Sequence, residues 1–102
     1  MLDRWLTRWS RNYAFLRRIL DCVGRDLARK PYDFLLQPGE QLSFSQLVEG
    51  VRVDFDVDVF RLDSDGTLWV SIETKAPLRT PLDIKPSLVF RKRPDGSAWI
   101  QL

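Results

Sequence analysis

Three carboxylates come nearest, by type and spacing, to a reactive site in this chain. Asp54, Asp56 and Asp58 alternate with apolar residues across positions 51–59. Side chains on a β-strand point alternately to two faces, so this pattern predicts a half-buried strand with the aspartates on one face. Neighbouring aspartates would lie about 6.6 Å apart, and Glu73 could join them from the next strand. Carboxylates at such separations act in inverting glycoside hydrolysis, and carboxylate clusters attract hard cations.

The geometry of a strand argues against both kinds of chemistry. Carboxylates on one straight strand diverge, whereas a metal ion or a scissile bond needs groups that converge from several directions. We therefore expect a solvated sheet face, with neither a catalytic residue nor a metal site. Cross-strand neighbours of opposite charge would neutralise the aspartates, and the candidates are Arg52, Lys75 and Arg91.

The composition also disfavours catalysis. The chain has no histidine, so it lacks the commonest general base and the commonest metal ligand. Its one cysteine, Cys22, can form neither an internal disulfide nor a zinc site by itself. Cys22 falls beside the apolar side of the predicted N-terminal helix, where we expect a buried, structural thiol, which is normally inert. We expect a protein without enzymatic activity or cofactor, in a reducing cytoplasm.

Residues 1–30 are predicted to form one long amphipathic helix. Apolar residues recur at alternating spacings of four and three, a helical period, at Leu2, Leu6, Trp9, Tyr13, Leu16, Leu20, Val23 and Leu27. Pro31 ends the helix because it disfavours helical geometry at the residue before it. The helix would be about 43 Å long, whereas a nine-residue strand reaches about 30 Å. Its first turns, with Trp5 and Trp9, would therefore project beyond the sheet, covered by the middle segment or by another subunit.

Charge is unevenly distributed along the chain. Residues 1–30 hold eight basic and three acidic residues, whereas the remainder holds eight basic and eleven acidic ones. Four helix arginines fall seven residues apart, on the side away from the apolar stripe: Arg4, Arg11, Arg18 and Arg25. We interpret this arginine row as the solvated back of the helix. Phosphate contacts are the alternative, but no nucleic-acid motif accompanies the row, so we do not expect nucleic acid as a partner.

The rest of the chain is predicted to be a connection followed by two β-hairpins. In the connecting segment, 31–50, the sequence Ser-Phe-Ser-Gln at 43–46 has the spacing of a helix capping box, and Gly50 would stop a helix that begins there, which predicts a helix of one or two turns. The first hairpin, 51–76, turns at an Asp-Gly dipeptide, the strongest short hairpin signal. The second hairpin, 82–102, turns at a Pro-Asp-Gly sequence with proline and glycine in favoured positions.

These elements predict a single α+β domain over residues 1–102, with the long helix packed on a curved four-stranded antiparallel sheet. This order of elements resembles a cystatin-like or NTF2-like roll, in which a sheet curls around one long helix. No motif of either family accompanies the resemblance, so it implies no site residue. No apolar run approaches the roughly 20 residues that span a membrane, and the N-terminus lacks a secretory pattern. We expect no membrane partner.

The outward face of the predicted sheet is the candidate binding surface. Counting around the second turn places Arg91 opposite Trp99 on this face, as a cation–π pair. Phe60 and Trp69 are predicted on the same face, beside the acids. Aromatic and arginine side chains dominate the energetics of protein interfaces. We therefore expect a contact surface for a protein partner or for a second copy of the chain.

The first functional hypothesis is a non-catalytic interaction or self-association module, with a homodimer as one form. The alternative is a ligand or enzyme pocket between helix and sheet. Its candidate residues are the carboxylates of Asp33, Asp83 and Glu49 and the phenols of Tyr13 and Tyr32. The second alternative is weak nucleic-acid binding through the arginine row.

Overall fold

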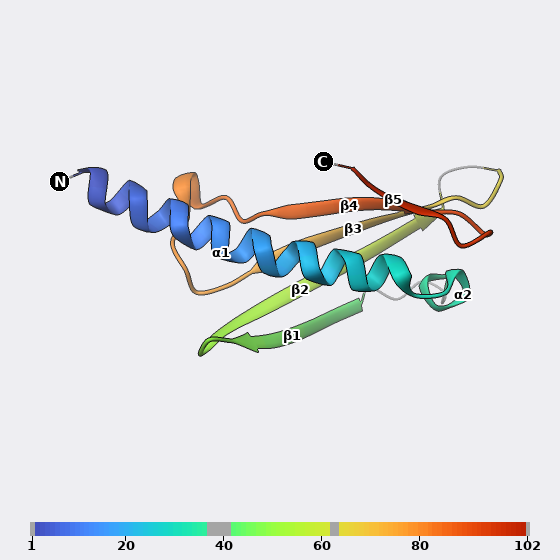
Figure 1. Ribbon diagram of the computed structural model, residues 1–102, viewed down its shortest axis with the longest axis horizontal. Coiled ribbons are helices and arrows are strands. Elements are labelled where there is room, and N and C mark those ends of the chain that lie inside the picture. Colours follow the sequence, from blue (N-terminus) through green and yellow to red (C-terminus); the bar gives the residue numbers. More distant parts are fainter. Residues whose placement is uncertain (1, 37–41, 62–63, 102) are drawn as a thin grey trace.

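The computed structural model describes residues 2–36, 42–61 and 64–101, and the side chains of 7–36, 43–61 and 64–100. Two α-helices come first, α1 (Leu2–Arg29) and α2 (Tyr32–Leu35). They are followed by strands β1 (Leu42–Val48), β2 (Val51–Arg61) and β3 (Leu68–Lys75), a short 3₁₀ helix η1 (Pro81–Asp83), and strands β4 (Ser87–Lys92) and β5 (Ala98–Gln101). Over the described ranges the strands form one antiparallel sheet in the order β1-β2-β3-β4-β5, with α1 along one face (Figure 1). The predicted α+β class is confirmed.

Helix α1 packs by the apolar stripe that its sequence predicts. Leu16 and Leu20 are fully buried, and Val23 and Leu27 nearly so. Gly24 lies at the contact with β4, where a Cβ atom would come 2.9 Å from the Leu88 side chain. The missing side chain therefore lets the helix approach the sheet closely, which offsets the cost of about 1 kcal/mol that glycine carries inside a helix.

The prediction of a short helix at 43–46 is wrong, because this segment is strand β1. The sheet therefore has five strands in the described part of the chain, one more than expected. Residues of β1 alternate between the faces, and the inward-facing Phe44 stacks on Phe55 of β2 with ring centroids 5.0 Å apart. A cap contributes about 1 kcal/mol, which is less than a paired strand gains from its ladder and from burial of an aromatic ring.

The turn between β1 and β2 explains why Gly50 resembled a helix stop. Glu49 and Gly50 both have positive φ, at 51° and 79°, as the two central residues of a type I′ hairpin turn require. The short helix of the connecting segment lies earlier, at Tyr32–Leu35 directly after Pro31. A glycine that ends a helix and one that turns a hairpin share the same left-handed backbone, so local sequence does not separate them.

Both predicted hairpins form, and the second has the predicted register. The Arg93 N–H donates to the Ser97 carbonyl at 2.9 Å, and Phe90 lies opposite Ile100. The inner faces of the strands and the apolar stripe of α1 enclose one core. Its largest fully buried members include Phe55, Phe90, Leu16, Leu20, Leu68 and Ile72. The predicted core face of β2 is confirmed, and its opposite face carries the candidate site.

Candidate interaction face on the outer side of the sheet

The outer face of the sheet brings together one residue from each of four strands. Phe60 of β2 lies opposite Trp69 of β3, which lies opposite Arg91 of β4, which lies opposite Trp99 of β5. We call these four residues the aromatic–arginine row. The structure thus unites the four predicted aromatic and arginine residues in a single line across the sheet, because residues directly opposite one another share a face.

The arginines of this region stack on the tryptophans. The Arg91 guanidinium lies 5.1 Å from the ring centroid of Trp69, and that of Arg93 lies 4.8 Å from Trp99. The predicted cation–π pair of Arg91 with Trp99 is therefore wrong: Arg91 stacks on Trp69, and Arg93 stacks on Trp99. The Arg91 Nε atom is shielded from solvent and has no hydrogen-bond partner in the described part of the chain.

Asp54 is held by two side chains from neighbouring positions. Ser45 of β1 donates a hydrogen bond to its Oδ1, and the Arg52 Nε lies 3.1 Å from the same oxygen. The serine hydrogen bond, followed by that of Arg52, lowers the pKa of Asp54 below its ordinary value. The carboxyl is therefore charged near neutral pH and is no proton donor.

Asp56 is bound from both sides. Lys75 of β3 approaches its Oδ2 at 2.7 Å, and Ser43 of β1 donates to its Oδ1 at 2.9 Å. The lysine hydrogen bond is the main cause that lowers the pKa of Asp56, and the serine adds to it. The same pairing raises the pKa of Lys75. Cross-strand neutralisation by Lys75 was predicted, whereas Ser43 and Ser45 were missed because their segment was expected to be helical.

The other two acids of this face, Asp58 and Glu73, lie opposite Ser71 and Ser87 in the register. Glu73 also lies opposite Asp56. In the part of the chain that the structure describes, no three acidic, cysteine or histidine residues are grouped so that they could hold a metal ion. The outer face therefore combines charged groups with aromatic rings.

The N-terminal turns of α1 do project beyond the strands, beside the segment that contains η1 (Figure 1). The Asn12 side-chain nitrogen donates to the Arg79 carbonyl of this segment at 2.8 Å. This hydrogen bond shows that the connection between β3 and β4 lies next to this part of the helix. The connecting segment 31–50 was the predicted neighbour. Trp9 is partly buried, and the side chain of Trp5 lies outside the described residues.

The candidate pocket residues do not converge. Tyr32 donates a hydrogen bond to the Gly66 carbonyl, whereas Asp83 is bound by Lys85 at 3.0 Å in the β3–β4 connection. Glu49 lies in the turn between β1 and β2. These residues lie at separate edges of the molecule, around an interior filled with apolar side chains.

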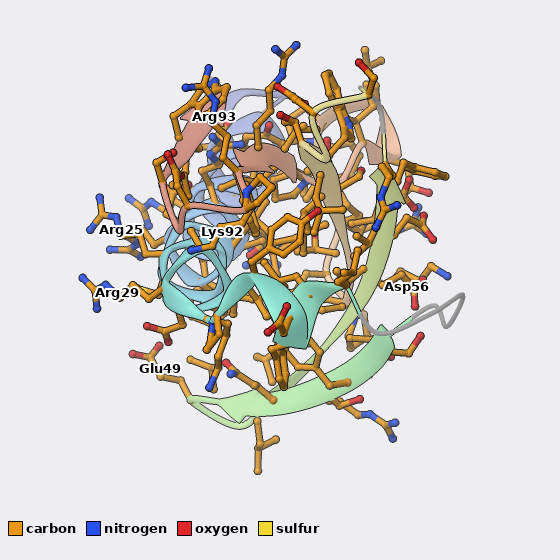
Figure 2. All side chains as sticks on the ribbon, turned by 90° about the vertical axis from the view of Figure 1, so that its right-hand side faces the viewer. Arg25, Arg29, Glu49, Asp56, Lys92 and Arg93 are labelled. Carbon is orange, nitrogen blue, oxygen red and sulfur yellow. The ribbon has the colours of Figure 1, made fainter. Side chains whose placement is uncertain are left out.

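The exposed arginines of α1 and the aspartates of β2 lie on opposite sides of the sheet. Arg25 and Arg29 extend from α1 on one side, and Asp56 lies on the opposite side of the sheet (Figure 2). Arg11, Arg18 and Arg25 of the arginine row are exposed, as predicted for the back of a helix, and the Arg4 side chain lies outside the described residues. The expectation that Cys22 is buried is wrong: it lies at the rim of the apolar stripe and is exposed.

The chain matches no family model, no curated protein and no solved structure. Among the helices described, none combines the length and the apolar character needed to cross a bilayer.

Proposed function

We propose that this chain is a non-catalytic interaction module that pairs with a second copy of itself through the outer face of the sheet. The observation that carries the proposal is the division of this face into two halves of opposite charge. The acidic half consists of Arg52, Asp54, Asp56, Asp58, Glu73 and Lys75. The arginine half consists of the aromatic–arginine row together with Arg93.

The two halves have equal and opposite charge. Two basic and four acidic residues give the acidic half a net charge of −2, and Arg91 and Arg93 give the arginine half +2. Asp65 and Asp95 lie in the turns beyond the arginine half; both are charged, because hydrogen bonds within their turns and the nearby Arg93 lower their pKa, so the +2 counts the residues of the face and not those of the turns. The face is thus complementary to itself.

A twofold axis between two such sheets, running across the strands, places each acidic half on the arginine half of the other copy. Closed twofold contacts are the commonest form of self-association, and they need a self-complementary surface of this kind. Opposite charges would set the orientation, and the aromatic rings would supply the buried apolar area.

The size of the face is sufficient for a stable pair. The five strands hold 36 residues, which at about 3.3 Å per residue and about 4.8 Å between strands cover roughly 570 Å² per copy. A pair would bury roughly 1,100 Å² in total, which exceeds the roughly 1,000 Å² that a specific interface needs. We also propose that the fold is a cystatin-like or NTF2-like roll, because the chain has the same order of elements as such a roll.

Charge inversion tests the pairing. Replacing Asp58→Lys with Glu73→Lys makes both halves +2, and replacing Arg91→Glu with Arg93→Glu makes both halves −2. We expect the wild-type protein to sediment as a dimer at tens of micromolar, each double variant as a monomer, and an equimolar mixture of the two as a heterodimer. Circular dichroism spectra would verify that both variants are folded.

A matched control lies outside the face. Leu82 is 88% exposed in η1, so Leu82→Ala removes exposed apolar surface and should leave the dimer unchanged. A wild-type protein that stays monomeric at several hundred micromolar would refute the proposal. So would double variants that still dimerise alone.

A further inference from the structure

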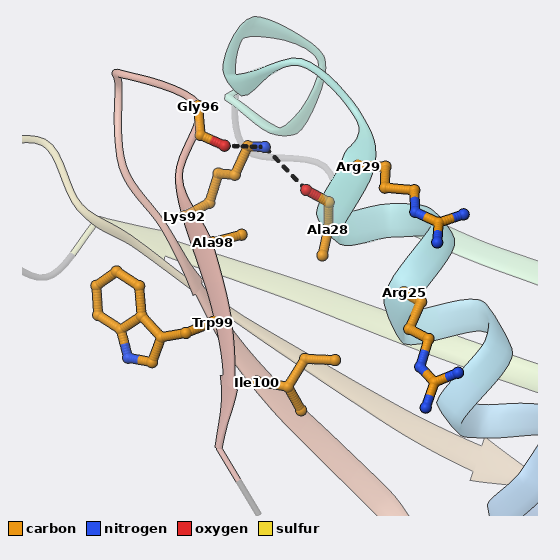
Figure 3. A pocket seen from close by; sticks show the side chains of 8 residues that line it. All are labelled: Arg25, Ala28, Arg29, Lys92, Gly96, Ala98, Trp99 and Ile100. Carbon is orange, nitrogen blue, oxygen red and sulfur yellow. Dashed lines mark hydrogen bonds between the residues drawn. The ribbon is translucent and has the colours of Figure 1, made fainter.

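A basic groove runs beside the free edge of the sheet. β5 is the last strand of the sheet over the described ranges, so one of its edges has no partner strand there. Between this edge and α1 lies a groove of about 540 Å³. It is lined by Arg25, Ala28 and Arg29 of α1 and by Lys92, Gly96, Ala98, Trp99 and Ile100 of the last hairpin (Figure 3).

We propose that this groove binds an extended acidic segment of another protein, which adds to β5 as a sixth strand. The proposal does not rest on the outer-face dimer, because Arg25 and Arg29 lie on the helix side of the sheet; of the groove's lining residues, Trp99 alone also belongs to the aromatic–arginine row. Strand addition of this kind takes its affinity from backbone hydrogen bonds and its specificity from alternate side chains of the incoming segment.

The backbone of β5 presents the hydrogen-bonding groups that an incoming strand needs. Arg93 and Ser97 form a hydrogen-bonded pair, and in an antiparallel ladder hydrogen-bonded residues alternate with residues whose N–H and C=O point outward. The backbone N–H and C=O groups of Trp99 are therefore hydrogen-bonded to β4, whereas those of Ala98 and Ile100 point to the open edge. The side chains of these two residues also line the groove.

The opposite wall of the groove supplies the charge. Arg25 and Arg29 are exposed on α1, across the opening from Ala98 and Ile100 (Figure 3). Neither has an ion pair with any acid in the described part of the chain. Residues four apart on a helix lie about 5–6 Å apart, close to the roughly 6.6 Å between alternate residues of a strand. Two carboxylates at alternate positions of a segment could therefore each meet one guanidinium.

Lys92 fixes the width of the groove. Its ammonium donates to the Ala28 carbonyl of α1 and to the Gly96 carbonyl of the hairpin turn, both at 2.8 Å. The dashed lines in Figure 3 show this bridge at one end of the groove. The lysine is thereby engaged with the backbone, so the free positive charge in the groove comes from the two arginines.

The grooves on the other side of α1 differ in charge. They share Phe15, Arg18 and Glu49 among their lining residues, and Glu49 would repel an acidic segment. Charge complementarity therefore selects the β5 side for an acidic partner.

The test uses a fluorescein-labelled peptide of four Glu-Val repeats, with a peptide of four Lys-Val repeats as its control. We expect the acidic peptide to bind the full chain by fluorescence anisotropy and the basic peptide not to bind. Arg25→Ala combined with Arg29→Ala should weaken binding at least tenfold. Arg11→Ala combined with Arg18→Ala removes the same charge from the same helix and should weaken it less than twofold.

Amide hydrogen exchange separates strand addition from general charge attraction. If the peptide adds to β5, the amides of Ala98 and Ile100 should exchange at least tenfold more slowly in its presence. An equal loss of affinity for the acidic peptide in the Arg25/Arg29 and Arg11/Arg18 double variants would overturn the proposal. So would unchanged exchange at these two amides, or binding of the basic peptide with similar affinity.

Discussion

The two faces of β2 lie within one strand and have opposite surroundings. Val53, Phe55 and Val57 are fully buried in the core. Asp54 and Asp56, between them in sequence, are partly exposed and bound by polar side chains from β1 and β3. Burial of apolar area is lost outright when a core residue is truncated, whereas water compensates for a lost exposed ion pair. The inner face therefore determines stability, and the outer face is free to serve recognition.

The largest effect should come from truncating the inner face at Phe55. Phe55→Ala removes a fully buried ring that stacks on Phe44, and such changes cost about 3–5 kcal/mol of unfolding free energy. Ser71→Ala, on the outer face, should change it by no more than about 0.5 kcal/mol. Urea denaturation at one protein concentration measures both. Similar losses in the two variants would contradict the distinction between the faces.

The polar end of the inner face is tested by Lys92→Met. Lys92 is 4% exposed and donates to two backbone carbonyls. Methionine keeps the apolar stem but leaves both carbonyls without this donor, so we expect a loss of about 1.5–3 kcal/mol. Denaturation with urea again gives the value. An unchanged midpoint would mean that water replaces the ammonium at no cost.

Truncation of the aromatic–arginine row should separate stability from association. Trp69→Ala removes one ring and its cation–π contact with Arg91, which costs roughly 1 kcal/mol in the folded monomer. Its effect on pairing should be larger, a rise of at least tenfold in the dimer dissociation constant measured by sedimentation. If the Trp69→Ala variant unfolds more easily but dimerises normally, the aromatic–arginine row is not part of the dimer contact.

The smallest effect concerns the pH dependence of stability. The pKa of Asp56 is lowered in the folded protein from its ordinary value of 3.8 by hydrogen bonds from Lys75 and Ser43. A carboxyl whose pKa is lower in the folded state than in the unfolded state stabilises the protein at pH values above its unfolded-state pKa. This stabilisation is lost as the pH falls through the folded-state pKa. Stability should therefore decline below about pH 4, and Asp56→Asn should make this decline shallower. Coincident acid unfolding curves for the wild-type protein and the Asp56→Asn variant would contradict this prediction.

Sequence reasoning succeeded where the signal was local and strong. The apolar stripe of α1, the alternation in β2 and both hairpin turns were read correctly, and with them the residues of the outer face. It failed at β1, where a capping-box spacing suggested a helix. The serines of that segment instead bind Asp54 and Asp56, and only the pairing of β1 with β2 brings them there.

The direction of each side chain is a local property, because backbone dihedral angles alternate it along a strand and rotate it around a helix. The periodicity of the amino acids therefore decided which residues would be buried and which would be exposed. Which exposed residues meet is a property of strand register and helix placement, set by contacts between distant segments. For this reason Arg91 stacking on Trp69, and Arg25 facing the edge of β5, became visible only in the folded chain.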